Sequence, residues 1–437
     1  MPSMACYEVQ TSGPLSGAAA ISGATKNSGC KILAASLLAS GTTRISNIPE
    51  VGDLRVMLEL LRHLGVSSRR IDEQTLEIDT SGTIAPHAPL ELVNQMRASV
   101  NVLGPLLART GMASVALPGG DAIGARKLDM HIRGLERLGA EVRVDAGYIE
   151  ARGDELVGER IELEFPSVGA TENLLSAAVL ARGTTVIENA AREPEITELG
   201  AYLNRMGAQV IGAGTSTIEI HGVEQLTPVD VELMGDRVEA GTLLMACGVA
   251  GGEIELTGVR PDHIEIVTLK LTEMGMRISP TPDGIWACRR EPLRAVDIAT
   301  LPFPGFATDF MPLALAVMTL SDGTGIVTEN VFDARYTFTN ELVKMGADIR
   351  TDGRHAIVRG VPHLCGTSVL ANDVRAGASL TLAGLGARGT TIVSGIEHVE
   401  RGYADLPGQL RQLGARIRRL DTDSVSCDTG AVPKEQP

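Results

Sequence analysis

The sequence is poor in aromatic residues and lacks the cysteine and histidine spacings that mark disulfide-stapled or metal-bound folds. Aromatic residues make up 3% of the chain, and its six cysteines include no C-x-x-C pair. Cysteines scattered through so long a chain indicate free or buried thiols in a reducing compartment and argue against a disulfide framework. The eight histidines contain no H-x-x-x-H pattern, so the sequence predicts no metal site.

Long apolar runs and an excess of positive charge are absent as well. The chain shows no basic-then-apolar leader and no apolar run of the roughly 18 residues that a membrane span requires, so we expect a cytoplasmic protein. Its formal net charge of −15 argues against nucleic acid or an anionic membrane as the main partner. A small anionic substrate is still compatible with this charge, because a local group of arginines can outweigh distant acids.

Glycine, in contrast, is abundant. The 437 residues include 49 glycines, and 44% of the chain is hydrophobic. This composition is typical of an α/β protein with many short elements joined by glycine turns. A chain of this length exceeds one ordinary core, so we expect two large domains. The last stretch, 428–437, is polar and lacks periodicity, and we expect it to be loose.

The strongest internal signal is a sixfold repeat. A phrase of leucine, two residues, Leu or Met and then glycine recurs every 68 to 74 residues. Its glycines are Gly65, Gly139, Gly207, Gly275, Gly346 and Gly414. A second phrase, such as GTTRISN from Gly41 or GTTVIEN from Gly183, keeps step with the first. Six near-equal spacings indicate six copies of one structural unit.

Each unit reads as helix, strand, helix, strand, strand. The segment Asn173–Arg182 is apolar almost all round, which predicts a buried helix, and 208–222 has the pattern of a hairpin. Three units per domain place the first domain at 23–231 and the second at 1–22 and 232–427, with Tyr7–Ala20 as a strand of the second. Six small domains on a string are the alternative, which we disfavour because units of about 70 residues with buried helices need neighbours.

Cations recur at equivalent places in the units. One set follows the GTT-type strands: Arg126, Arg192, Arg260, Arg335 and Arg401. A second set stands near the starts of buried helices: Lys26, Arg97, Arg237 and Arg375. Free N–H groups and the positive end of a helix dipole add to such a charge, so these places suit a phosphate or carboxylate group. Taken singly, each arginine is equally compatible with a solvated surface pair.

A series of motifs in order resembles the UDP-N-acetylglucosamine enolpyruvyl transferase family. They include GATKNSGCKILAASLLASG from Gly23, LPGGDAIGAR from Leu117, SVGATEN from Ser167, FATDF from Phe306 and ERGY from Glu400. The resemblance extends from about residue 7 to about residue 420. It implies a two-domain inside-out α/β barrel, in which each domain has three repeated helix–strand units with buried helices and outer sheets.

The resemblance also implies a reaction. The enolpyruvyl group of phosphoenolpyruvate would be transferred to the 3-hydroxyl of a uridine nucleotide, most simply UDP-N-acetylglucosamine for peptidoglycan precursor synthesis, with release of phosphate. Such chemistry needs an acid to protonate the enol carbon, a base for the hydroxyl proton, and cations for a phosphate and a carboxylate. The expected partners are therefore these two small molecules, and no cofactor or metal is implied.

Functional roles follow from matching the family motifs residue by residue. The implied catalytic residues are Asp121, Asp309, Lys26 and Arg401. The implied phosphoenolpyruvate ligands are Lys26, Arg97, Arg126, Arg335, Arg375 and Arg401. The implied uridine-nucleotide ligands are Asn27, Arg126, Lys127, Leu128, Asp129, His131, Ser167, Val168, Gly169, Asp309, Val331 and Phe332.

Asp121 departs from the commonest family pattern. Most members carry a cysteine there, which serves as general acid and is alkylated by fosfomycin, whereas an aspartate can transfer a proton but is a poor soft nucleophile. We therefore expect an active enzyme that fosfomycin does not inactivate. An aspartate beside glycines is also common in turns, so a purely structural role is the alternative. We expect the loop Leu117–Arg126 to close as the two halves come together over the substrate.

Further departures leave the acceptor open. Thr25 looks like an insertion before Lys26, Lys127 replaces a usual proline, and Ala307 and Met311 flank Asp309 where Pro and Gln are usual. One alternative is transfer to the ribose 3-hydroxyl of UMP, as in nucleoside-antibiotic pathways, because Lys127 suits a terminal phosphate. A second alternative is a non-catalytic paralogue that binds a UDP-sugar. The related enolpyruvylshikimate-phosphate synthase activity is disfavoured by the uridine-type loop.

Overall fold

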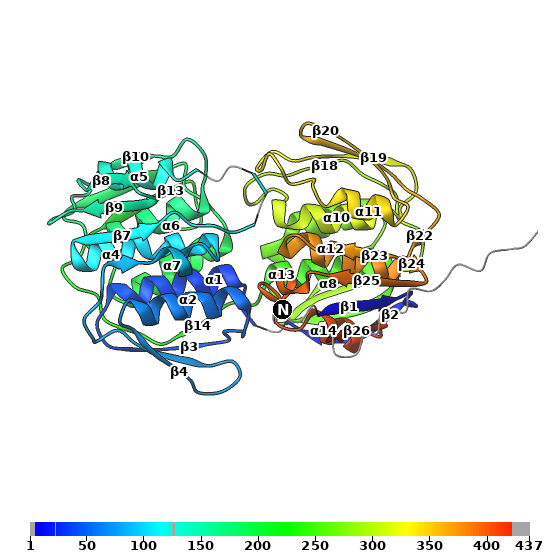
Figure 1. Cartoon of the computed structure of the whole chain (residues 1–437), viewed down its shortest axis with the longest axis horizontal. Helices are drawn as coiled ribbons and strands as arrows, with labels where there is room; N and C mark the ends of the chain where they lie inside the picture. The colour runs from blue at the N-terminus through cyan, green and yellow to red at the C-terminus, as the bar shows by residue number, and fades with distance from the viewer. Residues whose placement is uncertain (1–4, 22, 122, 125–126, 422–437) are drawn as a thin grey trace, which may run out of the picture.

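The structure is a computed structural model that describes residues 5–21, 23–121, 123–124 and 127–421. Arg126 and the tail 428–437, for which we stated expectations above, lie outside the described residues. Two bodies lie side by side in Figure 1, with the first three units in one and the last three in the other.

The first half contains three units of the same order. Unit one is α1 (Lys26–Ala35), β3 (Thr42–Ser46), α2 (Gly52–His63), β4 (Ser67–Arg70) and β5 (Leu76–Asp79). Unit two is α4 (Leu103–Thr110), β7 (Met112–Ala116), α5 (Asp129–Arg137), β8 (Glu141–Asp145) and β9 (Tyr148–Arg152). Unit three is α6 (Val168–Ala178), β11 (Thr184–Glu188), α7 (Pro194–Arg205), β12 (Gln209–Ile211) and β13 (Thr217–His221).

The second half repeats this order. Unit four is α8 (Arg237–Ala250), β15 (Gly252–Thr257), α9 (Glu265–Met274), β16 (Arg277–Thr281) and β17 (Gly284–Arg289). Unit five is α10 (Met311–Met318), β19 (Thr324–Thr328), α11 (Thr339–Lys344), β20 (Asp348–Asp352) and β21 (His355–Arg359). Unit six is α12 (Val374–Gly386), β25 (Thr390–Ser394), α14 (Leu406–Gln412), β26 (Ile417–Leu420) and, from the start of the chain, β1 (Cys6–Gln10).

Each unit builds a four-stranded sheet with one topology. An edge strand pairs in parallel with the strand after the buried helix, and the two remaining strands continue the sheet antiparallel. The edge strands are β14 (Val231–Glu232), β6 (His87–Ala88), β10 (Arg160–Glu162), β2 (Leu15–Ala20), β18 (Ile298–Ala299) and β23 (Ser368–Leu370). The remaining elements are α3 (Leu90–Val93), α13 (Ile396–Glu400), β22 (Leu364–Cys365), β24 (Ala387–Arg388), η1 (Ser36–Leu38), η2 (Arg97–Val102), η3 (Pro261–Ile264) and η4 (Thr308–Phe310).

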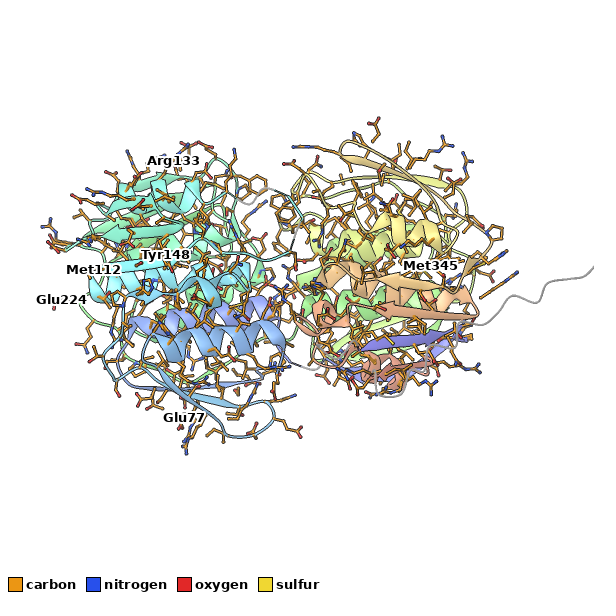
Figure 2. The ribbon with its side chains drawn as sticks, viewed as in Figure 1. Glu77, Met112, Arg133, Tyr148, Glu224 and Met345 are labelled. Atoms are coloured by element: carbon orange, nitrogen blue, oxygen red, sulfur yellow. The ribbon has the colours of Figure 1, made fainter. Side chains whose placement is uncertain are left out.

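The first helix of each unit lies inside and the sheets lie outside, which confirms the predicted fold class (Figure 1). All eight residues of α10 are buried, as expected for a helix that is apolar on every side. The buried side chains form two separate cores, one within residues 24–233 and the other from 5–21 and 238–417. Figure 2 shows side chains filling both bodies, while Glu77, Arg133 and Glu224 point outward.

Glycine explains why the repeat could be seen in the sequence. The six glycines that end the L-x-x-L/M-G phrases all have φ between 91° and 119°. This left-handed region strains any residue with a β-carbon, and glycine adopts it freely at the end of a helix. The second helix of each unit therefore ends just before this glycine, where the chain turns back into the next strand of the sheet.

The structure differs from two of the expected element boundaries. Tyr7–Ala20 forms two strands, β1 and β2, because Gly13 and Pro14 separate them, and the strands join different sheets of the second half. The helix expected over Asn173–Arg182 instead spans Val168–Ala178. Its earlier start is stabilised by Ser167, whose hydroxyl accepts a hydrogen bond from the Ala170 N–H at 3.3 Å.

The chain crosses between the halves twice, and the two crossings lie side by side. Ala24 and Gly235 form an isolated antiparallel bridge, and the Asp236 N–H donates to the Gly23 carbonyl at 2.9 Å. The five cysteines among the described residues are free thiols. Among the described helices, none combines the length and apolarity needed to traverse a membrane.

Candidate functional site

A cavity of about 610 Å³ lies between the two halves. It is lined by the first residues of α1, α5, α6, α8 and α12, so several buried helices begin at its wall. Helix starts present free N–H groups and the positive end of the dipole, which favours bound anions. A second hollow of about 640 Å³ beside β2, β15 and β17 contains none of the predicted site residues.

A chain of alternating charges crosses the cavity from one half to the other. Lys26 at the start of α1 donates to Asp53 Oδ2 at 2.6 Å, and Arg401 Nε donates to Asp53 Oδ1 at 2.8 Å. A terminal guanidinium nitrogen of Arg401 then donates to Asp121 Oδ1 at 2.9 Å. Asp53 is 2% exposed, whereas Lys26, Arg401 and Asp121 keep 16%, 22% and 16% of their side chains exposed. Three of these four groups therefore remain open to a ligand.

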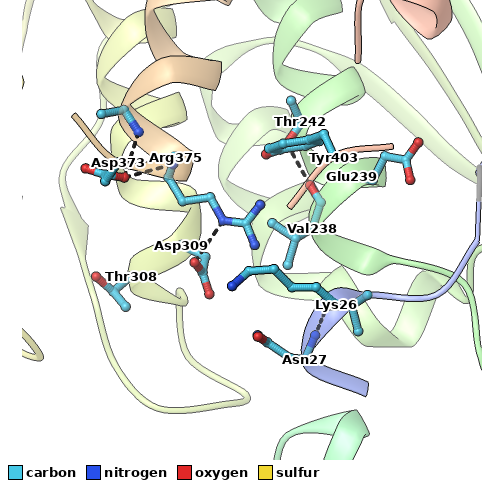
Figure 3. Close-up of polar contacts among 12 residues, drawn as sticks. Lys26, Asn27, Val238, Glu239, Thr242, Thr308, Asp309, Asp373, Arg375 and Tyr403 are labelled. Atoms are coloured by element: carbon cyan, nitrogen blue, oxygen red, sulfur yellow. Dashed lines mark hydrogen bonds and ion pairs between the residues drawn. The ribbon is translucent and has the colours of Figure 1, made fainter. Parts of the chain in front are cut away.

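A second cluster lies on the wall formed by the second half. Arg375 Nε donates to Asp309 Oδ1 at 2.9 Å, and Arg335 lies 3.7 Å from Asp373 Oδ1. Burial raises the pKa of Asp309, but the charges of Arg375 and Arg335 outweigh it and hold that pKa well below its usual range. Figure 3 shows the Lys26 side chain reaching toward the Asp309–Arg375 pair from across the cavity.

Both arginines of this cluster retain unused donors. Among the described residues, Arg335 Nε and one terminal nitrogen of Arg375 are buried without a hydrogen-bond partner. The Arg375 guanidinium also lies over the Tyr403 ring, 5.2 Å from its centre, which stabilises the cation. A buried cationic donor without a partner is costly, and an entering phosphate or carboxylate would satisfy it.

The first half contributes a neutral histidine. The Asn173 amide accepts from the Gly104 N–H at 2.8 Å, so its nitrogen is the group that faces His131 Nδ1 at 3.0 Å. His131 Nδ1 must then accept, which leaves the ring proton on Nε2, beside Gly169. Burial, together with the charge of Arg97, lowers the pKa of His131 to about 3. His131 is therefore an uncharged donor at neutral pH.

The loop that carries Asp121 touches the second half. Ile123 accepts from the Ala334 N–H at 3.2 Å, and a β-carbon at Gly124 would lie 3.0 Å from the Asp333 nitrogen. Gly119 fits close against Asn94, since a β-carbon there would lie 1.9 Å from the Asn94 carbonyl oxygen. Gly119 thus serves close packing, and the positive φ values fall on Gly120 and Gly124.

Most of the predicted site residues meet in this cavity. Those that line it are Lys26, Asn27, Arg97, Asp121, Lys127, Asp129, His131, Ser167, Val168, Gly169, Asp309, Val331, Phe332, Arg335, Arg375 and Arg401. Leu128 does not line it, because its apolar side chain packs into the core of the first half. Arg126 lies outside the described residues. Arg192 is exposed, and Arg260 pairs with Asp262 at the surface, so these two repeat arginines lie elsewhere.

Several acids at the cavity were missed by the sequence analysis. Asp53, Glu172 and Glu195 are buried, and each binds a cation. Glu172 pairs with Lys31 at 2.9 Å, while Glu195 of the first half pairs with Arg237 of the second at 2.9 Å. Nothing in the local pattern marked them, because an acid in the first turn of a helix, as Asp53 is, reads as ordinary helix capping. Within the described residues, no group of His, Cys, Asp and Glu is arranged to hold a metal ion.

Chemically, the cavity combines anion-binding donors with two carboxylates from opposite halves. The cations and helix starts suit a ligand that carries a phosphate and a carboxylate. Asp121 and Asp309 supply two groups that can exchange protons with a molecule held between them.

Comparisons with known proteins identify the family to which the chain is similar. The family profile described as EPSP synthase (3-phosphoshikimate 1-carboxyvinyltransferase) matches residues 9–410. The chain is 49% identical over 411 residues to a UDP-N-acetylglucosamine 1-carboxyvinyltransferase of Nocardia farcinica, covering 93% of this chain and 96% of the relative. It is 48% identical over 406 residues to the protein of the same name from Corynebacterium jeikeium, covering 93% and 97%.

A solved structure extends the likeness to three dimensions. The enolpyruvyl transferase NikO from Streptomyces tendae superposes with a TM-score of 0.85 at 28% identity, covering 96% of this chain and all of that one. The match therefore includes both halves of the chain.

Proposed function

Because the chain belongs to the family of enolpyruvyl (1-carboxyvinyl) transferases, we propose that it transfers the enolpyruvyl group of phosphoenolpyruvate to the 3-hydroxyl of UDP-N-acetylglucosamine and releases phosphate. The observation that carries the proposal is the convergence of Lys26, Arg375 and Arg401 with two carboxylates in one cavity. Peptidoglycan precursor synthesis and a cytoplasmic location follow from this activity.

The cations have a direct role in this proposal. Phosphoenolpyruvate carries a phosphate and a carboxylate, and Lys26, Arg97 and Arg401 would bind them. Arg335 and Arg375 complete the binding site, because their unpartnered nitrogens are donors already in place. Donors fixed before the reaction cost little reorganisation when charge moves from the enol oxygen to the leaving phosphate. Arg126 completes the set by its motif.

Asp121 is proposed to be the acid. Protonated Asp121 would give its proton to the terminal carbon of phosphoenolpyruvate, and the acceptor oxygen would form a bond to the adjacent carbon. Loss of a proton from the new methyl group, with cleavage of the bond to phosphate, would then restore the double bond and release phosphate. In the structure Asp121 accepts from Arg401, so an entering substrate anion that takes over this guanidinium would free Asp121 for proton transfer.

Asp309 is proposed to receive the hydroxyl proton. Its strongly lowered pKa makes it a weak base at rest, so the transfer must accompany carbon–oxygen bond formation, when the hydroxyl becomes far more acidic. Its Oδ1 is held by Arg375, which leaves Oδ2 for the substrate.

The uridine nucleotide would lie along the first half. Asn27, Lys127, Asp129 and Ser167 to Gly169 of the first half line the cavity, and neutral His131 would act as a positioned donor. Val331 and Phe332 would contact the nucleotide from the second half. We propose that 23–231, on one side, and 1–22 with 232–427, on the other, act as the two domains that close around both substrates.

An acceptor panel tests the proposal. Purified protein is incubated with phosphoenolpyruvate and either UDP-N-acetylglucosamine or UMP, and phosphate release is measured, with Asp309→Asn as the inactive control. We expect release with UDP-N-acetylglucosamine. Release with UMP alone would establish the alternative acceptor, which Lys127 suggested, and no release with any nucleotide would overturn enolpyruvyl transfer altogether. The non-catalytic alternative gains no support from relatives that are named as transferases.

Fosfomycin provides a separate prediction for Asp121. The wild type should keep full activity after prolonged incubation with fosfomycin, because a carboxylate attacks the epoxide poorly. Asp121→Cys should stay active and then lose activity with time, with a mass increase of one fosfomycin on the loop peptide. Phosphate release measures the activity, and mass spectrometry of the digested protein locates the adduct. A covalent adduct on wild-type Asp121 contradicts the prediction.

A further inference from the structure

Asp53 is the most buried member of the charge chain, and each of its two oxygens accepts from a cation of a different half. Oδ2 accepts from Lys26 at 2.6 Å and Oδ1 from Arg401 Nε at 2.8 Å. At 2% exposure it has no room to bind a ligand itself. Its role must therefore act through the two cations.

Backbone contacts fix this arrangement further. The Asp53 N–H donates to the Arg401 carbonyl at 3.2 Å, so the start of α2 and the segment after α13 are joined by main chain as well as by side chains. The preceding residue is glycine for a steric reason, since a β-carbon at Gly52 would lie 3.0 Å from the Arg401 Cα. The two halves are thus held in close contact at this point.

Arg401 divides its donors between a buried and an accessible acid. Its Nε is used by Asp53, while a terminal nitrogen is used by Asp121 on the loop. Asp53 is fixed in a helix, and Asp121 lies in a glycine-rich loop. The Asp121 contact can therefore be given up to an incoming anion while the Asp53 contact stays.

We propose that Asp53 is a positioning residue that holds Lys26 and Arg401 at the separation and orientation needed to bind the anionic groups of phosphoenolpyruvate. This inference rests on the proposed function and adds a residue that the family resemblance did not supply. Without the carboxylate the two cations repel each other, and Lys26 loses its only side-chain partner recorded within the described residues.

The test separates the two substrates. In Asp53→Asn we expect kcat/KM for phosphoenolpyruvate, at saturating acceptor, to fall about 100-fold, as for a catalytic group displaced by about 1 Å. The dissociation constant for UDP-N-acetylglucosamine alone, measured by calorimetry, should change less than about twofold. Asp53→Glu keeps the charge on a longer stem and should recover part of the loss, and it serves as the second variant if Asp53→Asn folds poorly.

Glu195→Gln is the matched control. Glu195 is equally buried and also binds a cation of the opposite half, through Arg237 Nε at 2.9 Å, but it touches neither Lys26 nor Arg401. In this variant the contact between the halves is weakened in general. The fall in kcat/KM for phosphoenolpyruvate and the rise in the dissociation constant for UDP-N-acetylglucosamine should therefore be of similar size. A similar proportional loss in Asp53→Asn, or a loss of less than about threefold, would overturn the proposal.

A double-mutant cycle with Arg401→Lys tests the route of the effect. If Asp53 acts through Arg401, Asp53→Asn should lower kcat/KM for phosphoenolpyruvate by a smaller factor in the Arg401→Lys background than in the wild type. Additive losses of kcat/KM, expressed as free energies, contradict the inference. Failure of the wild type to release phosphate with any acceptor would instead concern the proposed function. If the wild type turns over normally and Asp53→Asn leaves kcat/KM for phosphoenolpyruvate unchanged, only the proposed role of Asp53 is wrong.

Discussion

Asp309 illustrates how neighbouring charges set the chemistry of a single residue. Burial alone would raise its pKa and favour the neutral acid, yet Arg375 and Arg335 lower that pKa far below the usual value. Because the folded pKa is lowered, the carboxylate persists at every pH at which the protein is expected to work. Protonation of Asp309 cannot then cause a loss of activity on mild acidification.

This leads to a prediction about pH dependence. Arg375→Met removes the nearest cation, so the pKa of Asp309 should rise, and kcat should fall more steeply on acidification toward pH 5 than it does in the wild type. Arg375→Lys keeps the charge and should leave this pH dependence near that of the wild type. Steady-state kinetics between pH 5 and pH 9 measure kcat, and equally steep falls in Arg375→Met and the wild type contradict the prediction.

The lowered pKa of His131 leads to a prediction about how the free energy of unfolding depends on pH. Its pKa is lowered to about 3 in the folded state, mainly by burial, whereas an unfolded histidine titrates near 6.5. Below about pH 6.5 the unfolded chain takes up a proton that the folded chain refuses, so stability present above that pH is lost on acidification toward pH 3. Between pH 7.5 and pH 5 this histidine should lower the free energy of unfolding by about 2 kcal/mol.

Urea unfolding at the two pH values checks this effect. His131→Asn keeps an acceptor near the Nδ1 position but cannot titrate, so its free energy of unfolding should fall less than that of the wild type by this amount. Equal falls in both proteins would show that His131 does not supply the effect.

At the scale of elements, the repeat glycines are the simplest determinants of the fold. Gly207 has a φ of 107°, and a β-carbon there would meet no atom within 4 Å, so only backbone strain opposes a substitution. Gly207→Ala should therefore lower the free energy of unfolding by about 1–2 kcal/mol. Gly13→Ala is the control, because its site is equally open and its φ lies outside the left-handed region. Denaturant unfolding that ranks the two variants equally contradicts this explanation.

The same glycines explain how far the sequence could predict the fold. Helix ends and strand starts repeated every 68 to 74 residues were visible because glycine is needed at each turn. The start of α6 was missed because the apolar run begins only at Leu174, while the helix is set by the Ser167 cap upstream. The local sequence pattern therefore located the repeated units correctly but placed the start of α6 too late in the chain.

The site was predictable only in part, for a different reason. Cations at helix starts could be recognised singly, and family motifs grouped them. Asp53 and Glu195 could not be recognised, because their partners Arg401 and Arg237 stand in the opposite half and no periodicity relates them. Contacts between two domains depend on how whole surfaces meet, which a single sequence does not encode in any local pattern.

At the scale of the molecule, the contact between the halves includes buried charge. Glu195 and Arg237 are 3% and 8% exposed, so removing one charge leaves the other desolvated and unpaired. Glu195→Gln should lower the free energy of unfolding by about 3 kcal/mol. Glu155→Gln breaks a pair in which both side chains are more than 60% exposed and should cost less than about 1 kcal/mol. Similar losses in the two variants, measured by denaturant unfolding, contradict this account of the contact.

The threading of the chain has a consequence for its synthesis. β1 pairs only with β25 and β26 among the described strands, so this strand, which is made before the whole first half, has no partner until residues 390–420 have been translated. The first half, whose core lies within residues 24–233, can assemble well before that. A message that ends before residue 390 would therefore yield a finished first half attached to an unpaired strand, and the nascent chain must protect that strand's edge until β25 and β26 have been made.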